Sequence, residues 1–126
     1  MIEISNVTAS YGKVEALNIR NLQFEDGVAY GVVGPNGAGK TTLFKTITNI
    51  ITNYNGIITI DNVDVRQHNE VLVNVGLVLD GLSVYKSRTG WFNIRYFGGL
   101  RGGFDEMAAR ELAQELDIYG VLTKPV

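Results

Sequence analysis

The stretch from Gly34 to Thr42 constrains this chain more than any other part of it. It reads Gly-Pro-Asn-Gly-Ala-Gly-Lys-Thr-Thr and satisfies the phosphate-binding loop pattern G-x-x-x-x-G-K-[ST]. The glycines allow the backbone to take positive φ angles and to approach an anion without a Cβ atom in the way. Such a loop turns its N–H groups toward a phosphate, and the following helix adds its positive N-terminal end. The chain is therefore expected to bind a nucleoside triphosphate.

The positions within the loop predict separate roles. Lys40 is expected to reach the β- and γ-phosphates and is the one residue predicted to be catalytic. The Thr41 hydroxyl is expected to ligate the Mg²⁺ that bridges those two phosphates. The other predicted nucleotide contacts within the loop are Gly34, Asn36, Gly37, Ala38, Gly39 and Thr42.

The flanks of the loop favour this interpretation over a plain glycine-rich turn before an ordinary helix. The run from Val28 to Val33 is short and apolar, as in a buried strand. After the loop, a helix over about 39–49 would place Leu43 and Ile47 on one face. Strand, glycine loop and helix are the arrangement that the motif requires.

Composition narrows the function classes. The chain has 126 residues, 45% of them apolar and 19% charged, which suits a globular domain with a core of its own. A net charge of −2 disfavours nucleic acid as a non-specific partner. The lack of cysteine excludes disulfides and thiolate metal sites, and the single histidine, His68, is expected at the surface. Because no apolar run is long enough to cross a membrane, the chain is expected to be cytoplasmic.

Periodicity predicts the remaining elements. Residues 2–8 and 14–24 are expected to form an antiparallel pair of strands, and 57–61 a short further strand. Residues 71–79 are almost wholly apolar, which predicts a strand buried on both faces. Near the C-terminus a helix is expected, with Asp105 as its N-cap and Glu106 paired with Arg110.

With these features in hand, the sequence resembles the nucleotide-binding subunit of ABC transporters. The sequence from Gly34 to Leu43 is that family's usual form of the loop. Ser10-Tyr11-Gly12-Lys13 followed by Ala16-Leu17 resembles its adenine-stacking segment. The resemblance implies that Tyr11 stacks on the base of ATP; the alternative is a turn residue at a strand end. Further similarity lies in Asn55–Ile58, Val75–Asp80, and Thr89, Asn93, Tyr96 and Phe97.

The resemblance implies an α/β fold: a P-loop NTPase of ABC type with an antiparallel β subdomain, a partial parallel sheet with flanking helices, and the start of a helical subdomain. Residues 1–80 would form the ATP-binding core and 81–126 the start of the helical subdomain. It further implies ATP and Mg²⁺ as cofactors, dimerisation with a second nucleotide-binding subunit, and attachment to a membrane permease at the inner face of the membrane. The similarity is greatest to the subgroup that serves drug or peptide export.

Two positions depart from the family's pattern. Asp80 stands where the family commonly has a glutamine that touches Mg²⁺ and the attacking water. Since a carboxylate is a hard oxygen donor, Asp80 is predicted as a second Mg²⁺ ligand; the alternative is the first residue of an Asp-Gly turn. Phe92 stands where many members carry a glutamate.

The 126 residues hold neither a Leu-Ser-Gly-Gly-Gln-like signature segment, nor an apolar strand ending in Asp-Glu, nor the switch histidine that the resemblance would supply. The chain is therefore expected to be a truncated domain with little ATPase activity of its own, although the intact protein would be an ABC-type ATP hydrolase. Two alternatives stay open. One is a non-hydrolytic or vestigial nucleotide-binding protein, and the other is a soluble ABC-like ATPase.

Residues 81–104 contain no acidic side chain and combine four cations with six aromatic residues. The resemblance implies that this segment docks the permease. A helix with an aromatic core face and a solvated basic face is the alternative, and the same pattern also occurs in nucleic-acid binding, which is the least favoured of the three interpretations.

Overall fold

The computed structural model describes residues 1–81, 84–100 and 102–126. The chain separates into two compact units, Met1–Leu79 and Asp80–Val126, and each is described by itself. Within the described residues, no helix is both long enough and apolar enough to cross a membrane.

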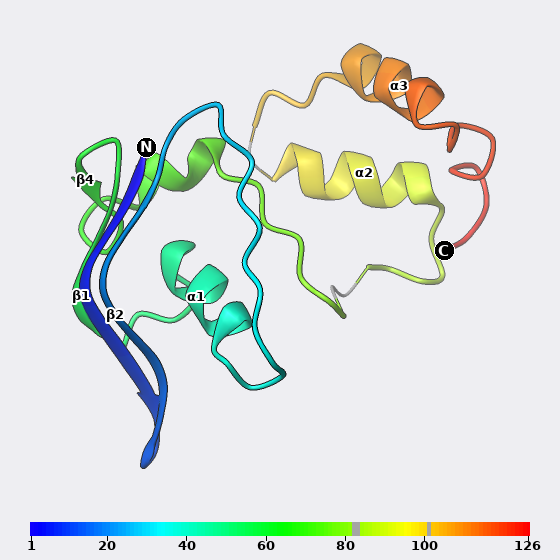
Figure 1. Ribbon diagram of the computed structural model, residues 1–126. Helices are drawn as coiled ribbons and strands as arrows, with labels where there is room; N and C mark the ends of the chain where they lie inside the picture. The colour runs from blue at the N-terminus through cyan, green and yellow to red at the C-terminus, as the bar shows by residue number, and fades with distance from the viewer. Residues whose placement is uncertain (82–83, 101) are drawn as a thin grey trace. The chain divides into compact units, whose positions relative to one another are not determined.

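The first unit is built on an antiparallel sheet with the strand order β2-β1-β3-β4 (Figure 1). Strands β1 (Ile2–Tyr11) and β2 (Val14–Phe24) form a long hairpin, as the sequence predicts. Strand β3 (Asn55–Ile60) pairs with β1, and the two-residue β4 (Val63–Asp64) pairs with β3. The predicted antiparallel β region is thus confirmed, with its third strand beginning slightly earlier than expected.

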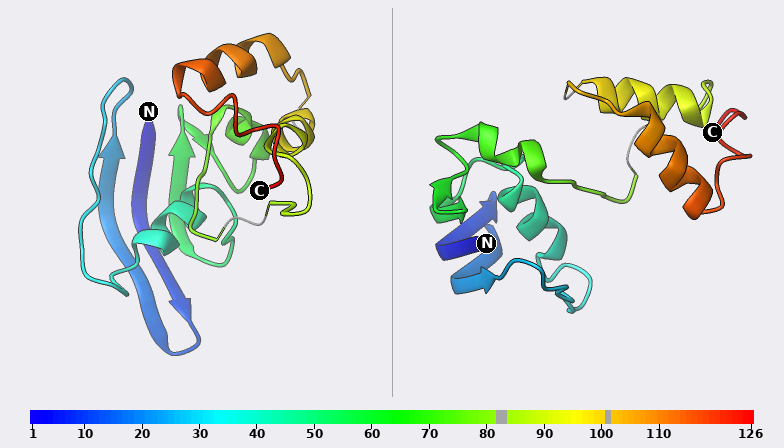
Figure 2. Two further views of the ribbon diagram at one scale, coloured as in Figure 1. Left: turned by 90° about the vertical axis from the view of Figure 1, so that its right-hand side faces the viewer. Right: turned by 90° about the horizontal axis from the view of Figure 1, so that it is seen from above.

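Helix α1 (Lys40–Ile47) covers one face of this sheet, as the views in Figure 2 show. Its buried side chains Leu43 and Ile47 pack into the same core as the inward residues of the strands. This packing follows from the two periodicities, because alternate strand residues and every third or fourth helix residue meet between the layers. The buried core consists of Ile4, Val7, Ala9, Leu17, Leu43, Ile47, Tyr54, Ile58, Ile60 and Val65.

The predictions of strands over 28–33 and 71–79 are wrong. Residues 28–33 have no regular structure, and Val33 is 96% exposed. The 3₁₀ helix η1 (Asn69–Asn74) takes up the first part of the predicted strand over 71–79, and the rest is irregular. The reason is that apolar content predicts burial, whereas a strand also needs a neighbour for its hydrogen-bond ladder. No parallel strand pair is present among the described residues, so this part of the expected sheet does not form.

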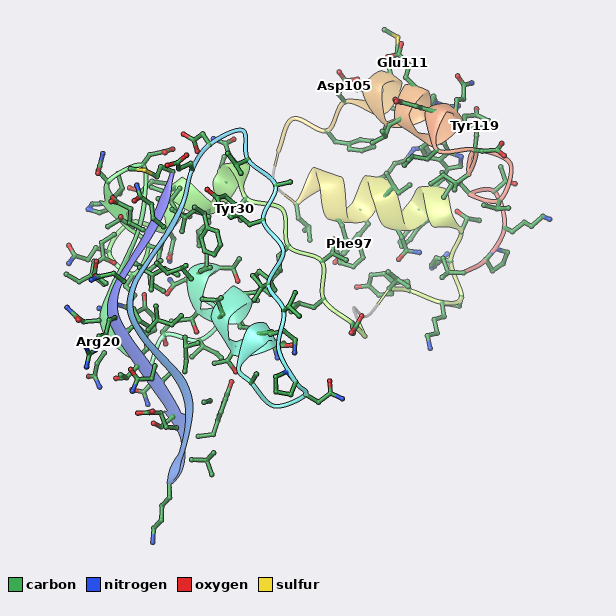
Figure 3. All side chains as sticks on the ribbon, in the orientation of Figure 1. Arg20, Tyr30, Phe97, Asp105, Glu111 and Tyr119 are labelled. Atoms are coloured by element: carbon green, nitrogen blue, oxygen red, sulfur yellow. The ribbon has the colours of Figure 1, made fainter. Side chains whose placement is uncertain are left out.

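The second unit contains α2 (Gly90–Gly99) and α3 (Glu106–Glu115). Asp105, labelled in Figure 3, caps α3 as predicted, because its carboxylate accepts hydrogen bonds from the N–H groups of Met107 and Ala108. The predicted Glu106–Arg110 pair is confirmed at 2.7 Å.

Glu106 joins the two helices of this unit. Besides Arg110, it receives a hydrogen bond from Arg95 of α2 at 2.6 Å. These two guanidinium groups, Arg95 first, hold the pKa of the Glu106 carboxyl below its usual value. One cation of the expected basic face of α2, Arg95, is therefore paired with α3, although both side chains stay exposed.

Candidate nucleotide-binding site

The phosphate-loop segment forms a tight turn directly before α1. The Ala38 N–H donates to the Pro35 carbonyl at 3.1 Å, which closes a four-residue turn with Gly37 at φ 84°. Gly39 follows at φ 89° and is the N-cap residue of α1. Both φ angles lie in the left-handed region that glycine adopts without a steric penalty, which accounts for glycine at these two positions; of the two, only Gly39 is required by the motif.

Gly39 also lies very close to the β-hairpin. A Cβ atom on Gly39 would lie 2.2 Å from the carbonyl oxygen of Ala16 in β2, well inside contact distance. The loop can lie this close to the hairpin only because residue 39 has no side chain. Ala16 belongs to the stretch that resembles the family's adenine-stacking segment, but the sequence gives no indication of its contact with Gly39.

The N-terminus of α1 points its uncapped N–H groups into the loop. No side chain caps this helix, and its first turn contains no acidic residue. The first backbone N–H groups of a helix have no partner within the helix, and its dipole places partial positive charge at that end. Leu43, Thr46 and Ile47 are buried and anchor the helix in the core. A rigid, positively polarised end of this kind suits a phosphate group.

Lys40 folds back over the loop that precedes it. Its ammonium group donates to the carbonyl oxygens of Gly34 and Pro35, the latter at 2.8 Å. A Cβ atom on Gly34 would lie 3.2 Å from the Cβ of Ala38 and 4.0 Å from the Lys40 ammonium nitrogen. The tight contact is the one with Ala38, so the lack of a side chain at Gly34 leaves room for Ala38 in the loop. The Lys40 ammonium places a full positive charge beside the N-terminus of the helix.

A single depression of about 350 Å³ collects most of the predicted site residues. It is lined by Tyr11 from the hairpin, by Ala16 from β2, and by the continuous segment from Asn36 to Thr42. Tyr11 is 56% exposed, so a large part of its ring is accessible to a flat ligand. Gly34 is not part of the lining and touches the site only through the Lys40 contact.

The predicted metal ligands are in different units. Thr41 is an exposed residue in the first turn of α1, where its hydroxyl borders the depression. Asp80 is an exposed residue at the start of the second unit, in the turn before Gly81. Among the described residues, no group of three or more histidine, aspartate or glutamate side chains is placed to hold a metal ion. Thr41 fits the single protein ligand of a Mg²⁺ that is held mainly by phosphate oxygens and water.

The residues present fit a nucleoside triphosphate with Mg²⁺. The loop backbone lies against the hairpin at Gly39 with no room for a Cβ atom, the end of α1 is uncapped, and a lysine ammonium lies beside the loop carbonyls. The accessible ring of Tyr11 borders the same depression. Backbone N–H groups with a lysine would hold phosphate oxygens, and an aromatic face is suited to a nucleobase.

Two known proteins are similar to this chain in sequence. The bacitracin transport ATP-binding protein BcrA of Enterococcus faecalis is 28% identical over 120 residues, which cover 94% of this chain and 39% of BcrA. The methionine import ATP-binding protein MetN 3 of Oceanobacillus iheyensis is 31% identical over 133 residues, which cover 98% of this chain and 39% of MetN 3.

The fold has a counterpart among solved structures. The ATP binding subunit of an ABC transporter matches with a TM-score of 0.81 at 20% identity, covering 98% of this chain and 53% of that one. The expected ABC-type fold is therefore confirmed, apart from the partial parallel sheet, which is not formed among the described residues. The chain spans about half of that subunit and less than half of the two relatives above.

The family assignment rests on a match over most of the sequence. The profile of the family described as "ABC transporter" matches residues 17–126, which include the phosphate loop, α1 and both helices of the second unit. The chain belongs to the ABC transporter family, as the resemblance in its loop predicts.

Proposed function

We propose that this chain is the ATP-binding part of an ABC transporter and holds the triphosphate of Mg·ATP at residues 34–42. The observation that carries the proposal is the convergence of the uncapped α1 N-terminus, the Lys40 ammonium and the Tyr11 ring on one depression. Each of these groups matches one part of the nucleotide. The phosphates match the helix end and lysine, and the adenine matches the tyrosine ring.

Binding would change the partners of Lys40. Its ammonium would exchange the carbonyls of Gly34 and Pro35 for oxygens of the β- and γ-phosphates. The Thr41 hydroxyl would serve as a ligand of Mg²⁺, and the loop N–H groups would surround the β-phosphate. Asp80 stays a proposed second Mg²⁺ ligand, supported by its carboxylate chemistry alone.

For the 126-residue chain by itself we propose nucleotide binding with little turnover. In-line attack on the γ-phosphate requires a positioned water and charge compensation around the transferred group. The loop supplies part of this compensation through Lys40, but the sequence contains no signature-type segment and no apolar strand ending in Asp-Glu. In the family, such parts complete the ATPase in a dimer of two nucleotide-binding subunits, which is the assembly proposed here.

The proposed partner is a membrane permease that docks on residues 81–104 from the cytoplasmic side. Support comes from an aromatic cluster in this segment, which consists of Tyr85, Phe92, Tyr96 and Phe97. All four rings are more than a third exposed, and Arg88 lies over the Phe92 ring at 5.1 Å. An exposed aromatic surface with a cationic rim is typical of a protein interface.

Export of a peptide-like compound is the proposed direction of transport, supported by the relative that is named for bacitracin transport. Import is the second candidate, because another relative of similar identity is named for methionine import. The direction of transport depends on the permease with which the chain assembles. Transport assays with a co-purified permease would separate the two directions.

A direct test measures binding of a fluorescent ATP analogue with Mg²⁺. Lys40→Ala should weaken binding at least tenfold, since it removes a charge-assisted contact worth about 1.5–3 kcal/mol. Lys45→Ala is the matched control, because Lys45 lies in the last turn of the same helix and should leave binding unchanged. Equal affinities for the two variants would refute the proposal.

The base contact is tested separately. Tyr11→Ala should weaken ATP binding by about 1–3 kcal/mol, the usual contribution of one aromatic stacking contact. Tyr11→Phe keeps the ring and should bind like the unmodified chain. Loss of affinity in Tyr11→Phe as well would assign Tyr11 to a role other than stacking.

A further inference from the structure

The sequence contains two Asn-Gly steps, and one of them lies inside the phosphate loop. They are Asn36-Gly37 and Asn55-Gly56. Asparagine followed by glycine is the least hindered sequence for attack of a backbone nitrogen on the preceding side-chain amide, because glycine has no Cβ atom to shield its nitrogen. The two Asn-Gly steps therefore have the same intrinsic reactivity, and the surrounding fold determines how fast each one reacts.

The step in the loop is open. Asn36 and Gly37 are both exposed and occupy the two central positions of the turn that the Ala38–Pro35 hydrogen bond closes. That bond uses the Ala38 N–H, not the N–H of Gly37. A Cβ atom on Gly37 would have nothing within 4 Å, so among the described residues the space on this side of the Gly37 backbone is open.

The step in the sheet is held in place. Asn55 is paired with Thr8 across the β1–β3 ladder, and its side-chain amide donates to the Thr8 hydroxyl at 3.3 Å. A Cβ atom on Gly56 would lie 2.3 Å from the Asn6 carbonyl oxygen, which places the Gly56 backbone directly against β1. The Arg66 guanidinium also donates to the Gly56 carbonyl at 2.5 Å. These contacts oppose the rotation that cyclisation of Asn55 requires.

We propose that Asn36 is a site of spontaneous deamidation that places a carboxylate in the phosphate loop. The Gly37 backbone nitrogen attacks Cγ of Asn36, a new N–Cγ bond forms, and the Cγ–Nδ2 bond breaks. The leaving nitrogen departs as ammonia with the proton from the Gly37 N–H. Solvent water then opens the five-membered imide at either carbonyl carbon, which yields aspartate or isoaspartate. No oxidation or reduction takes place, and water is the only co-reactant.

The product opposes the function of the loop. Either form adds one negative charge to a segment that lines the phosphate depression, and isoaspartate also adds a methylene group to the backbone. Repulsion between this carboxylate and the phosphates should weaken Mg·ATP binding roughly tenfold in this partly screened position. The loss of affinity rests on the proposed function, whereas selective deamidation does not.

The test ages the purified 126-residue chain at mildly alkaline pH and maps its peptides by mass spectrometry. The mass change that follows replacement of NH₂ by OH should accumulate several-fold faster at Asn36 than at Asn55. In concentrated urea the two rates should converge, because the contacts that hold Asn55 are then lost. Equal rates in the native chain, or a difference that persists in urea, would overturn the proposal.

A second readout joins the modification to binding. In the Asn55→Ser variant, affinity for a fluorescent ATP analogue should fall in step with the deamidated fraction at Asn36. In the Asn36→Ser variant, affinity should stay at its own starting value throughout the same ageing. If the affinity for the ATP analogue stays unchanged while Asn36 is deamidated, the proposed effect of deamidation on nucleotide binding is refuted. A fresh chain that binds no nucleotide would instead refute the proposed function, and the peptide map would still decide the modification.

Discussion

The contact between Gly39 and the Ala16 carbonyl makes a sharp prediction about stability. In Gly39→Ala, the new Cβ atom would lie 2.2 Å from the Ala16 oxygen, and the residue would keep a φ angle near 89°. Gly37→Ala introduces the same side chain at φ 84° with nothing within 4 Å. The two variants therefore share the conformational strain and differ in the steric clash.

The expected magnitudes follow from these two terms. An L-residue held in the left-handed region costs about 1–2 kcal/mol, which is the whole effect expected for Gly37→Ala. The clash in Gly39→Ala is with backbone and not with the end of a flexible side chain, so either β2 or α1 must move. Overpacking of this kind adds about 1–3 kcal/mol, which gives a total of about 3 kcal/mol for Gly39→Ala.

Hydrogen–deuterium exchange in increasing urea, read on peptides from β1 and β2, is the appropriate assay. The only tryptophan, Trp91, lies in the second unit, so its fluorescence would not report on the sheet. Gly27→Ala is a control outside the loop, since Gly27 has a φ of 72° and nothing within 4 Å. If Gly39→Ala destabilises the sheet no more than Gly37→Ala and Gly27→Ala do, the argument from the Ala16 contact fails.

Three further predictions concern parts away from the loop. The low pKa of Glu106, held down by Arg95 and Arg110, contributes stability that is present above the ordinary glutamate pKa and lost as the pH falls through the lowered value. Thermal unfolding of the second unit should therefore separate wild type from Glu106→Gln near neutral pH, but not in strong acid. Asn93→Ala should destabilise this unit by about 2–3 kcal/mol in urea, because Asn93 is 5% exposed and makes three hydrogen bonds to loop backbone. Tyr54→Phe should not destabilise the first unit, since the buried Tyr54 hydroxyl has no hydrogen-bond partner among the described residues; a loss of more than about 1 kcal/mol would contradict this.

Local patterns predicted local structure well. The β1–β2 hairpin, the helix after the loop, the Asp105 cap and the Glu106–Arg110 pair all follow from contacts between residues close in sequence. Such features depend on turn chemistry and side-chain period, which a single sequence records. For the same reason the loop that begins α1 can be identified from its residues alone.

What sequence could not predict depends on distant neighbours. The apolar runs 28–33 and 71–79 have strand-like composition, but pairing is a property of two segments, and no described strand pairs with 28–33. The contact of Gly39 with Ala16 likewise joins residues from different elements, and nothing at Ala16 indicates it. Tyr11 was assigned by resemblance, and its position at the rim of the depression agrees with that assignment without testing it.

The hydrogen bonds of Lys40 to its own loop have a thermodynamic consequence for ligand choice. Because the ammonium already has two carbonyl partners, an incoming anion must offer more than those dipoles do before the lysine moves. A singly charged ion offers little advantage over two carbonyl groups, whereas a chain of phosphates offers several charged oxygens together. The hydrogen bonds of the back-folded lysine should therefore make the loop favour triphosphates over singly charged anions.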